Sequence, residues 1–171
     1  MKPTHRDSAS GTNDVASVSR NILIALRRII RTVALHSRQL MEEHGLTSVQ
    51  LAALHELASR GPMSARELAR CVQVSQPTIT GVLDRLEQRQ LITRTRGSKD
   101  RRTLHIAMTD QGREMLAAAP PLLQQQFTAA LAQLESWEQT MILATLQRIA
   151  AMMDARDLPA APLLETAPEQ L

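Results

Sequence analysis

The stretch SARELARCVQVSQPTITGVLDRL, Ser64 to Leu86, decides the fold of this chain of 171 residues. It holds two apolar patterns with the i, i+3, i+4, i+7 spacing that gathers side chains on one face of an α-helix. The first is Ala65, Leu68, Ala69 and Val72, and the second is Ile79, Val82, Leu83 and Leu86. Ser64 with Glu67 forms a capping box, and Ser75 can cap the second helix. Two short helices joined by so few residues predict a helix-turn-helix.

A basic segment follows, RTRGSKDRRTLHI at residues 94–106, with five Lys or Arg side chains and one acidic side chain, Asp100. The sequence on both sides is typical of strands, since Leu104, Ile106 and Met108 alternate with other residues and the region around Gly97 can turn. The basic segment is therefore predicted to be the tip of a β-hairpin. Strands at both ends argue against a disordered tail and against a localisation signal.

A long helix is predicted before this region, from about Ala16 to His44, because its apolar residues recur at spacings of three, four or seven. Apolar residues on more than one of its faces predict partners on two sides, one of them from another subunit. A separate helix then begins with a capping box, Thr47 with Gln50, and ends at Gly61-Pro62.

Helices also follow the hairpin, beginning near Thr109. Two prolines, Pro120 and Pro121, should kink or break the first of them at Ala119. A capping box of Ser136 with Gln139 predicts the start of the last helix. This helix is apolar nearly all round, so we expect it to be buried against a second subunit.

The fold class expected from these elements is mainly α with a small β-hairpin, a winged helix-turn-helix domain flanked by N- and C-terminal dimerisation helices. Its expected parts are a mobile N-terminal arm (1–14), an N-terminal dimerisation helix (15–46), a winged helix-turn-helix DNA-binding region (47–112), C-terminal dimerisation helices (113–154) and an extended C-terminal arm (155–171).

Composition narrows the function. Residues 47–112 hold ten Lys or Arg against six Asp or Glu, whereas residues 113–171 hold three against seven, so one part of the chain is suited to a polyanion and another is not. One Phe, one Trp and no Tyr leave almost no rings on which to stack RNA bases, which argues against RNA. One cysteine and no long apolar segment fit a cytoplasmic protein without a membrane partner.

The middle of the chain resembles the MarR family of winged helix-turn-helix regulators. The resemblance covers roughly residues 17–153 and is carried by LTSVQLAAL, VSQPTIT, LDRLEQRQLITR and above all SKDRRTLHIAMTDQG. The family's wing commonly reads D-x-R-D-x-R; here Gly97 and Lys99 replace its first Asp and Arg, and Gln90 stands where Gly usually ends the recognition helix. The C-terminal part is also similar to a subgroup linked to compatible-solute genes.

This resemblance implies a homodimer that binds a palindromic operator in double-stranded DNA and represses its own or neighbouring genes until a small molecule or environmental signal releases it. The residues expected to contact DNA are Ser64, Arg66, Ser75, Gln76, Thr78, Thr80, Arg85, Lys99, Arg101 and Arg102. Gln76 can recognise adenine and Arg85 guanine or phosphate, whereas Gly81 allows close approach. Lys99 is expected in a minor groove. Arg102 either contacts phosphate or pairs with Asp100.

An effector pocket is implied between the dimerisation helices and the DNA-binding region, near His36, Met41, His55 and Met115, each of which could instead be a packing residue. Cys71 is a candidate redox sensor, although a small buried hydrophobic residue is the simpler interpretation. No cofactor or metal is expected, and no nucleotide-binding or zinc-protease motif is present, so the protein is not expected to be an enzyme.

Two other hypotheses remain beside the ligand-responsive repressor. One is an architectural protein that binds DNA without regard to sequence. The other is a winged-helix module whose basic surface binds an acidic protein. The outward residues between Ser75 and Arg85 favour the repressor, because Pro, Gly and two Thr are poor choices for a helix face that is merely exposed.

Overall fold

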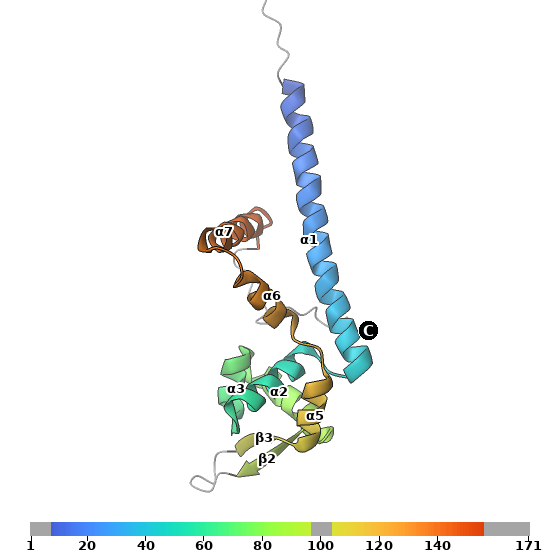
Figure 1. Cartoon of the computed structure of the whole chain (residues 1–171), viewed down its shortest axis with the longest axis vertical. Helices are drawn as coiled ribbons and strands as arrows, with labels where there is room; N and C mark the ends of the chain where they lie inside the picture. The colour runs from blue at the N-terminus through green and yellow to red at the C-terminus, as the bar shows by residue number, and fades with distance from the viewer. Residues whose placement is uncertain (1–7, 97–103, 156–171) are drawn as a thin grey trace, which may run out of the picture.

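The computed structural model describes residues 8–96 and 104–155, and α1 extends as one long helix from a lobe that contains the helix-turn-helix and the sheet (Figure 1). The elements in chain order are α1 (Ser8–His44), α2 (Ser48–Arg60), β1 (Met63–Ser64), α3 (Ala65–Val72), α4 (Gln76–Gln88), β2 (Ile92–Arg96), β3 (Leu104–Met108), α5 (Asp110–Ala118), α6 (Leu123–Leu131) and α7 (Ser136–Met152). The predicted fold class is confirmed. None of the helices described is long and apolar enough to cross a membrane.

The helix-turn-helix begins where local sequence predicts it. The Thr47 backbone N–H donates to the Gln50 side chain at 2.8 Å, and the Ser64 N–H donates to the Glu67 carboxylate at the same distance, so both capping boxes form. Ser75 caps α4 by accepting from the Thr78 N–H at 3.3 Å. These contacts satisfy donors that a helix start leaves without a partner.

The predicted hairpin is β2 and β3, and the structure adds a short strand to it. β1 pairs antiparallel with β3, with Met63 opposite Ile106, so the sheet order is β1-β3-β2. β1 lies directly before α3 and thus connects the helix-turn-helix to the hairpin. Two residues are too few for a periodic pattern, which is why the sequence did not predict this strand.

The core lies inside the lobe and contains the predicted apolar faces. Its buried members from α3 and α4 are Leu68, Ala69, Val72, Ile79, Val82, Leu83 and Leu86, packed with Leu51, Leu54, Leu91, Ile92 and Ile106 from neighbouring elements. Burial of this face of α4 leaves the opposite face of the helix at the surface.

Two boundaries differ from the sequence-based expectations. α1 begins at Ser8 rather than near Ala16, so residues 8–14 are helical. The capping box of α7 is Glu135 with Glu138, one residue earlier than Ser136 with Gln139; the Glu135 N–H donates to the Glu138 carboxylate at 2.9 Å. Gln139 instead donates to the carbonyls of Leu131 and Leu134.

The two prolines break the helix rather than kink it. α5 ends at Ala118, Ala119 is extended with ψ of 147°, and α6 begins only at Leu123. Because Pro120 and Pro121 provide no backbone N–H, the hydrogen-bond ladder of α5 cannot continue through them. The break separates α5, which packs in the lobe, from α6, which leads toward α7 (Figure 1).

The flanking helices keep large apolar side chains at the surface of the single chain. Val15 is 70% exposed, Trp137 is 64% exposed, and α7 has no buried residue. The expectation that α7 is buried is therefore not met within one chain. Apolar surface on this scale usually marks an interface.

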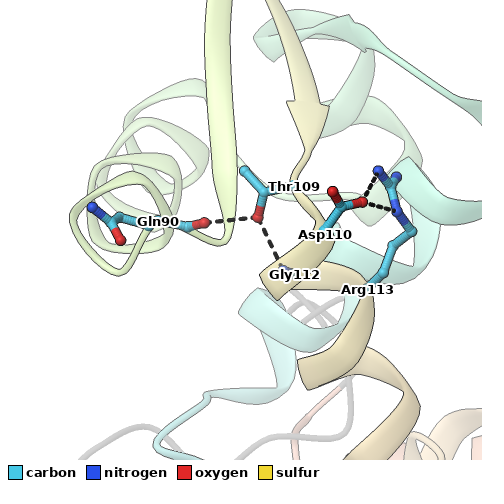
Figure 2. Close-up of polar contacts among 5 residues, drawn as sticks. All are labelled: Gln90, Thr109, Asp110, Gly112 and Arg113. Atoms are coloured by element: carbon cyan, nitrogen blue, oxygen red, sulfur yellow. Dashed lines mark hydrogen bonds and ion pairs between the residues drawn. The ribbon is translucent and has the colours of Figure 1, made fainter.

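The end of α4 is locked to the start of α5. Gln90 has a left-handed backbone with φ of 59°, and its carbonyl accepts from the Thr109 hydroxyl at 2.7 Å (Figure 2). The same hydroxyl accepts from the Gly112 N–H at 3.0 Å, so Thr109 caps α5 and binds the end of α4 at once. A Cβ at Gly112 would lie 2.2 Å from the Leu91 carbonyl oxygen, so only glycine fits there.

We expect Gly112→Ala to lower the free energy of unfolding by about 2 kcal/mol or more, because a Cβ against backbone requires the two segments to separate. Gly81→Ala is the matched control. Gly81 lies in α4 with nothing within 4 Å of a Cβ, and alanine there should raise stability by up to about 1 kcal/mol. Urea unfolding at equal protein concentration measures both, and equal effects of the two substitutions would contradict the assigned contact.

Candidate nucleic-acid interface

The exposed face of α4 carries short polar side chains near its N-terminus. Gln76, Pro77, Thr78, Thr80 and Gly81 are all exposed, while Ile79, between them in sequence, is completely buried. A helix with this arrangement presents amide and hydroxyl groups in a row without a bulky side chain to hold a partner away. Such groups can hydrogen-bond the edges of bases in a major groove.

The two threonine hydroxyls on this face are already oriented by local contacts. The Ser75 and Thr78 hydroxyls lie 2.7 Å apart, and the Thr80 hydroxyl donates to the Gln76 carbonyl at 2.9 Å. Each hydroxyl oxygen keeps a lone pair that can accept another hydrogen bond. The Gln76 side chain, at the first turn, and the Arg85 side chain, further along, are exposed.

Arg94 was missed by sequence reasoning, although it makes a central contact of this surface. Its Nη2 lies 2.6 Å from the Asp84 carboxylate and its Nε lies 3.4 Å from the Glu87 carboxylate. Arg94 thus connects β2 to α4 and partly neutralises two acidic side chains on the helix that carries the exposed polar face. The alternation of β2 contains a signal, since Arg94 shares a face with the buried Ile92 and needs a polar partner there.

The start of α3 is less suited to phosphate than the sequence implies. The Ser64 hydroxyl donates to the Glu67 carboxylate at 2.7 Å. The Ser64 backbone N–H, with a further contribution from its hydroxyl, lowers the pKa of Glu67, which keeps the carboxylate charged. A negative charge at this terminus repels phosphate. Arg66 is exposed on the same turn, so a phosphate contact here would depend on Arg66, and Ser64 serves first as a cap.

The three basic wing residues predicted to contact DNA, Lys99, Arg101 and Arg102, lie outside the described residues. The strands on either side are described up to the pair Arg96 and Leu104.

A cleft of about 490 Å³ lies between α2, the end of α3 and α6. Of the four effector-pocket candidates, only His55 lines it; His36, Met41 and Met115 do not. Burial lowers the pKa of His55, although the nearby Glu56 carboxylate acts in the opposite direction, so burial favours the neutral imidazole. The other polar lining residues are Glu56, Gln73, Gln124, Gln125 and Thr128.

Cys71 also lines this cleft and is partly exposed. Its side chain packs against the core, and a role as a redox sensor stays a prediction. Among the residues described, no three His, Cys, Asp or Glu side chains are grouped to hold a metal ion.

Comparisons with known proteins agree with this geometry. The model of the MarR family matches residues 46–104. The chain is 30% identical over 149 residues to the HTH-type transcriptional repressor NicR of Pseudomonas putida, covering 86% of this chain and 94% of that repressor. This chain belongs to the MarR family. Its members are transcriptional regulators rather than enzymes, and they bind DNA.

Two further relatives are similar to this MarR-family chain. It is 34% identical over 92 residues to the transcriptional repressor MdtR of Bacillus subtilis, an alignment that spans only 59% of that protein. A solved structure, a probable transcriptional regulator from Pseudomonas aeruginosa, is 33% identical with a TM-score of 0.51, covering 75% of this chain and 96% of that one.

Removal of Arg94 should weaken DNA binding more than folding. Arg94→Ala leaves Asp84 and Glu87 unpaired on α4. If α4 is the helix that contacts DNA, these carboxylates repel phosphate, and we expect affinity for an operator duplex to fall about tenfold. Stability should change by only about 1 kcal/mol, since ion pairs with exposed partners contribute little. Fluorescence anisotropy and urea unfolding measure the two effects.

A second variant separates charge masking from direct contact. Adding Asp84→Asn and Glu87→Gln to Arg94→Ala removes the unpaired carboxylates and should restore most of the affinity. If affinity stays low, Arg94 acts by touching DNA itself. Arg113→Ala is the matched control, because Arg113 forms its ion pair with Asp110 on α5.

Proposed function

We propose that this protein is a homodimeric, sequence-specific transcriptional repressor that binds a palindromic operator. The observation that carries the proposal is the division of α4 into a fully buried apolar face and an exposed face of Gln76, Thr78, Thr80 and Gly81. Burial fixes the rotation of the helix about its axis, so the polar face points outward in one defined orientation. Defined orientation is what readout of base edges requires.

Each exposed side chain of α4 has a distinct task in this proposal. Gln76 makes two hydrogen bonds to an adenine, and the methyl groups of Thr78 and Thr80 contact thymine methyls. Gly81, with open space around it, lets the helix backbone approach the groove. Arg85 reaches guanine or phosphate from the next turn. An architectural protein that binds any sequence has no use for this combination.

A second copy of the chain is the proposed partner of α1 and α7. Val15, Val18 and Ile22 of α1 line an open apolar groove with Ile149 and Met152 of α7, although most of these side chains remain exposed in the single chain. Covering both helices with the same helices of a second copy buries this surface and produces two-fold symmetry. Two recognition helices related by a two-fold axis require a palindrome.

The wing supplies affinity rather than sequence preference in this proposal. Lys99 enters a minor groove beside the half-site, and Arg101 and Arg102 hold phosphates. Contacts of this kind add favourable charge interactions without distinguishing one sequence from another.

Selection from random duplexes tests the proposal as a whole. Wild-type protein should select a palindrome with half-sites about 10 base pairs apart and bind it as two chains per duplex, as measured by sedimentation. If each chain neutralises about four phosphates, the slope of log affinity against log salt should be about −7. The substitution Gln76→Ala should relax selection at one position of each half-site with little change in that slope.

The alternatives predict other results. Binding to every duplex with equal affinity would indicate an architectural protein, and no binding at low salt would leave only a protein partner for the basic surface. A salt slope shallower than about −2 would show that two chains do not dock as proposed.

We also propose that a small molecule binds the cleft lined by His55 and releases the operator. The cleft separates α2 and α3 of the lobe from α6, which leads to α7. A molecule wedged there changes the angle between the lobe and the dimerisation helices. A ligand that prefers the resulting arrangement must lower affinity for DNA, because binding and shape are coupled. No Lys or Arg is among the described lining residues, which include Glu56, so the cleft favours a ligand that forms hydrogen bonds and carries no negative charge.

A large side chain placed in the cleft should have the same effect as the proposed ligand and lower the affinity for DNA. Ala129 lines it, and Ala129→Trp should lower affinity for the selected duplex between about 5- and 100-fold, in the range of typical coupling energies. It should also slow alkylation of Cys71 by iodoacetamide, which reports occupancy of the cleft. Ala130→Trp, on α6 outside the lining, is the control. Slower alkylation with unchanged affinity would show that the cleft is not coupled to DNA binding.

A further inference from the structure

We propose that Arg89 is a positioning residue that sets the angle between the recognition helix α4 and the dimerisation helix α1, and through it the spacing of half-sites that the dimer accepts. The inference rests on the proposed function, because it concerns how a dimer measures its operator. Arg89 was not among the residues expected to bind DNA, and its side chain points to the protein rather than to the exposed face of α4.

The contact joins the ends of two helices that are distant in sequence. Arg89 follows the last residue of α4, and its Nη2 donates to the carbonyl of His44 at 2.9 Å while its Nη1 donates to the carbonyl of Gly45. These carbonyls stand at the C-terminus of α1, where the helix dipole is negative and a guanidinium is favoured. The planar fork of Arg suits two adjacent acceptors, which a single ammonium does not.

The backbone of Gly45 is shaped to receive this side chain. Gly45 has φ of +62°, and a Cβ there would lie 3.5 Å from both terminal nitrogens of Arg89. The N–H groups of Gly45 and Leu46 already satisfy the carbonyls of Met41 and Leu40. Arg89 supplies side-chain partners for two carbonyls further along the same turn, those of His44 and Gly45.

Few other contacts hold α1 to the lobe. Among the side chains described from residue 14 to residue 44, Leu40 is the single one that is buried, and it packs into the lobe core. One apolar anchor resists separation but permits rotation about itself. The two hydrogen bonds of Arg89 add a second, directional attachment close to Leu40. Two attachments together fix the angle between α1 and the lobe.

The recognition helix is attached at the same end to α5. The carbonyls of Gln90 and Leu91 accept from the hydroxyl and the N–H of Thr109, at 2.7 and 3.1 Å. Three consecutive residues after α4 thus join it to both helices that lead toward the dimerisation surfaces. The N-terminal half of α4, which carries Gln76 and Thr80, is held in the lobe core through Ile79, so it moves with the lobe when the lobe turns relative to α1.

The angle at which α4 is held determines the spacing of the half-sites that the two recognition helices can reach. A helix of 13 residues is about 20 Å long. If the lobe turns by about 10° about the C-terminal end of α4, the N-terminus of α4 therefore moves by about 3.4 Å, which is the rise of one base pair. Loss of the Arg89 contact should let each recognition helix reach half-sites that are displaced by one base pair.

The experiment uses the duplex that wild-type protein selects from random sequences, together with two versions whose half-sites are one base pair closer or farther apart. We expect wild type to prefer the selected spacing by at least tenfold. Arg89→Gln should reduce this preference threefold or more, with an unchanged salt slope. Arg89→Lys should fall between them. Arg113→Gln, which removes the same charge from α5, should match wild type in both measurements.

Each other outcome has a defined meaning. An unchanged spacing preference in Arg89→Gln would overturn the positioning role and leave the proposed function intact. A salt slope lower by about 2 would show that Arg89 binds phosphate in each chain, which also overturns it. If wild type selects no duplex, the proposed function fails and this inference with it. If circular dichroism shows that Arg89→Gln does not fold, Arg89→Lys decides by the same two criteria.

Discussion

The burial of one face of α4 is the constraint on which the rest of the structure depends. A helix of 13 residues has little stability alone in water, and this one forms because Ile79, Leu83 and Leu86 have almost no exposed surface in the core. Side chains buried to this extent each contribute about 1.5–3 kcal/mol. The same burial fixes which residues face outward, so the stability of the lobe and its capacity to recognise bases depend on opposite faces of one helix.

The ends and flanks of α4 are held by polar contacts whose roles differ from those of the core. Arg94 binds Asp84 and Glu87 from the neighbouring strand and so adjusts the charge of the exposed surface. At the C-terminal end of α4, Thr109 of the α5 cap donates to the Gln90 carbonyl, and Arg89 donates to the His44 carbonyl at the end of α1. Only the N-terminal turns, where Gln76 and Thr78 lie, carry no such attachment to α1 or α5. The C-terminal end of α4 is thus attached to the neighbouring helices α1 and α5, whereas its N-terminal end carries the polar side chains proposed to contact DNA.

Sequence-based prediction was accurate for interactions between near neighbours in the chain and failed for interactions between distant segments. Capping boxes at Thr47 and Ser64 were predicted correctly because both partners lie within one turn. At α7 the sequence predicted a box of Ser136 with Gln139, and the structure has Glu135 with Glu138 instead. The pairing of β1 with β3 joins segments about forty residues apart in sequence, and nothing in Met63 or Ser64 reveals it. The effector-pocket candidates also depended on contacts between distant segments, and of the four only His55 lines the cleft.

By itself the sequence determined the helix-turn-helix, the hairpin, the faces of α3 and α4, and the polar residues that α4 turns outward. All of these depend on periodicity, capping and turns, which are interactions between near neighbours in the chain. Tertiary structure alone decided that Arg94 masks two carboxylates, that Cys71 and His55 share a cleft, that only glycine fits at position 112, and that Arg89 joins α4 to α1. These depend on contacts between segments far apart in sequence, whose distances are fixed only when the core closes.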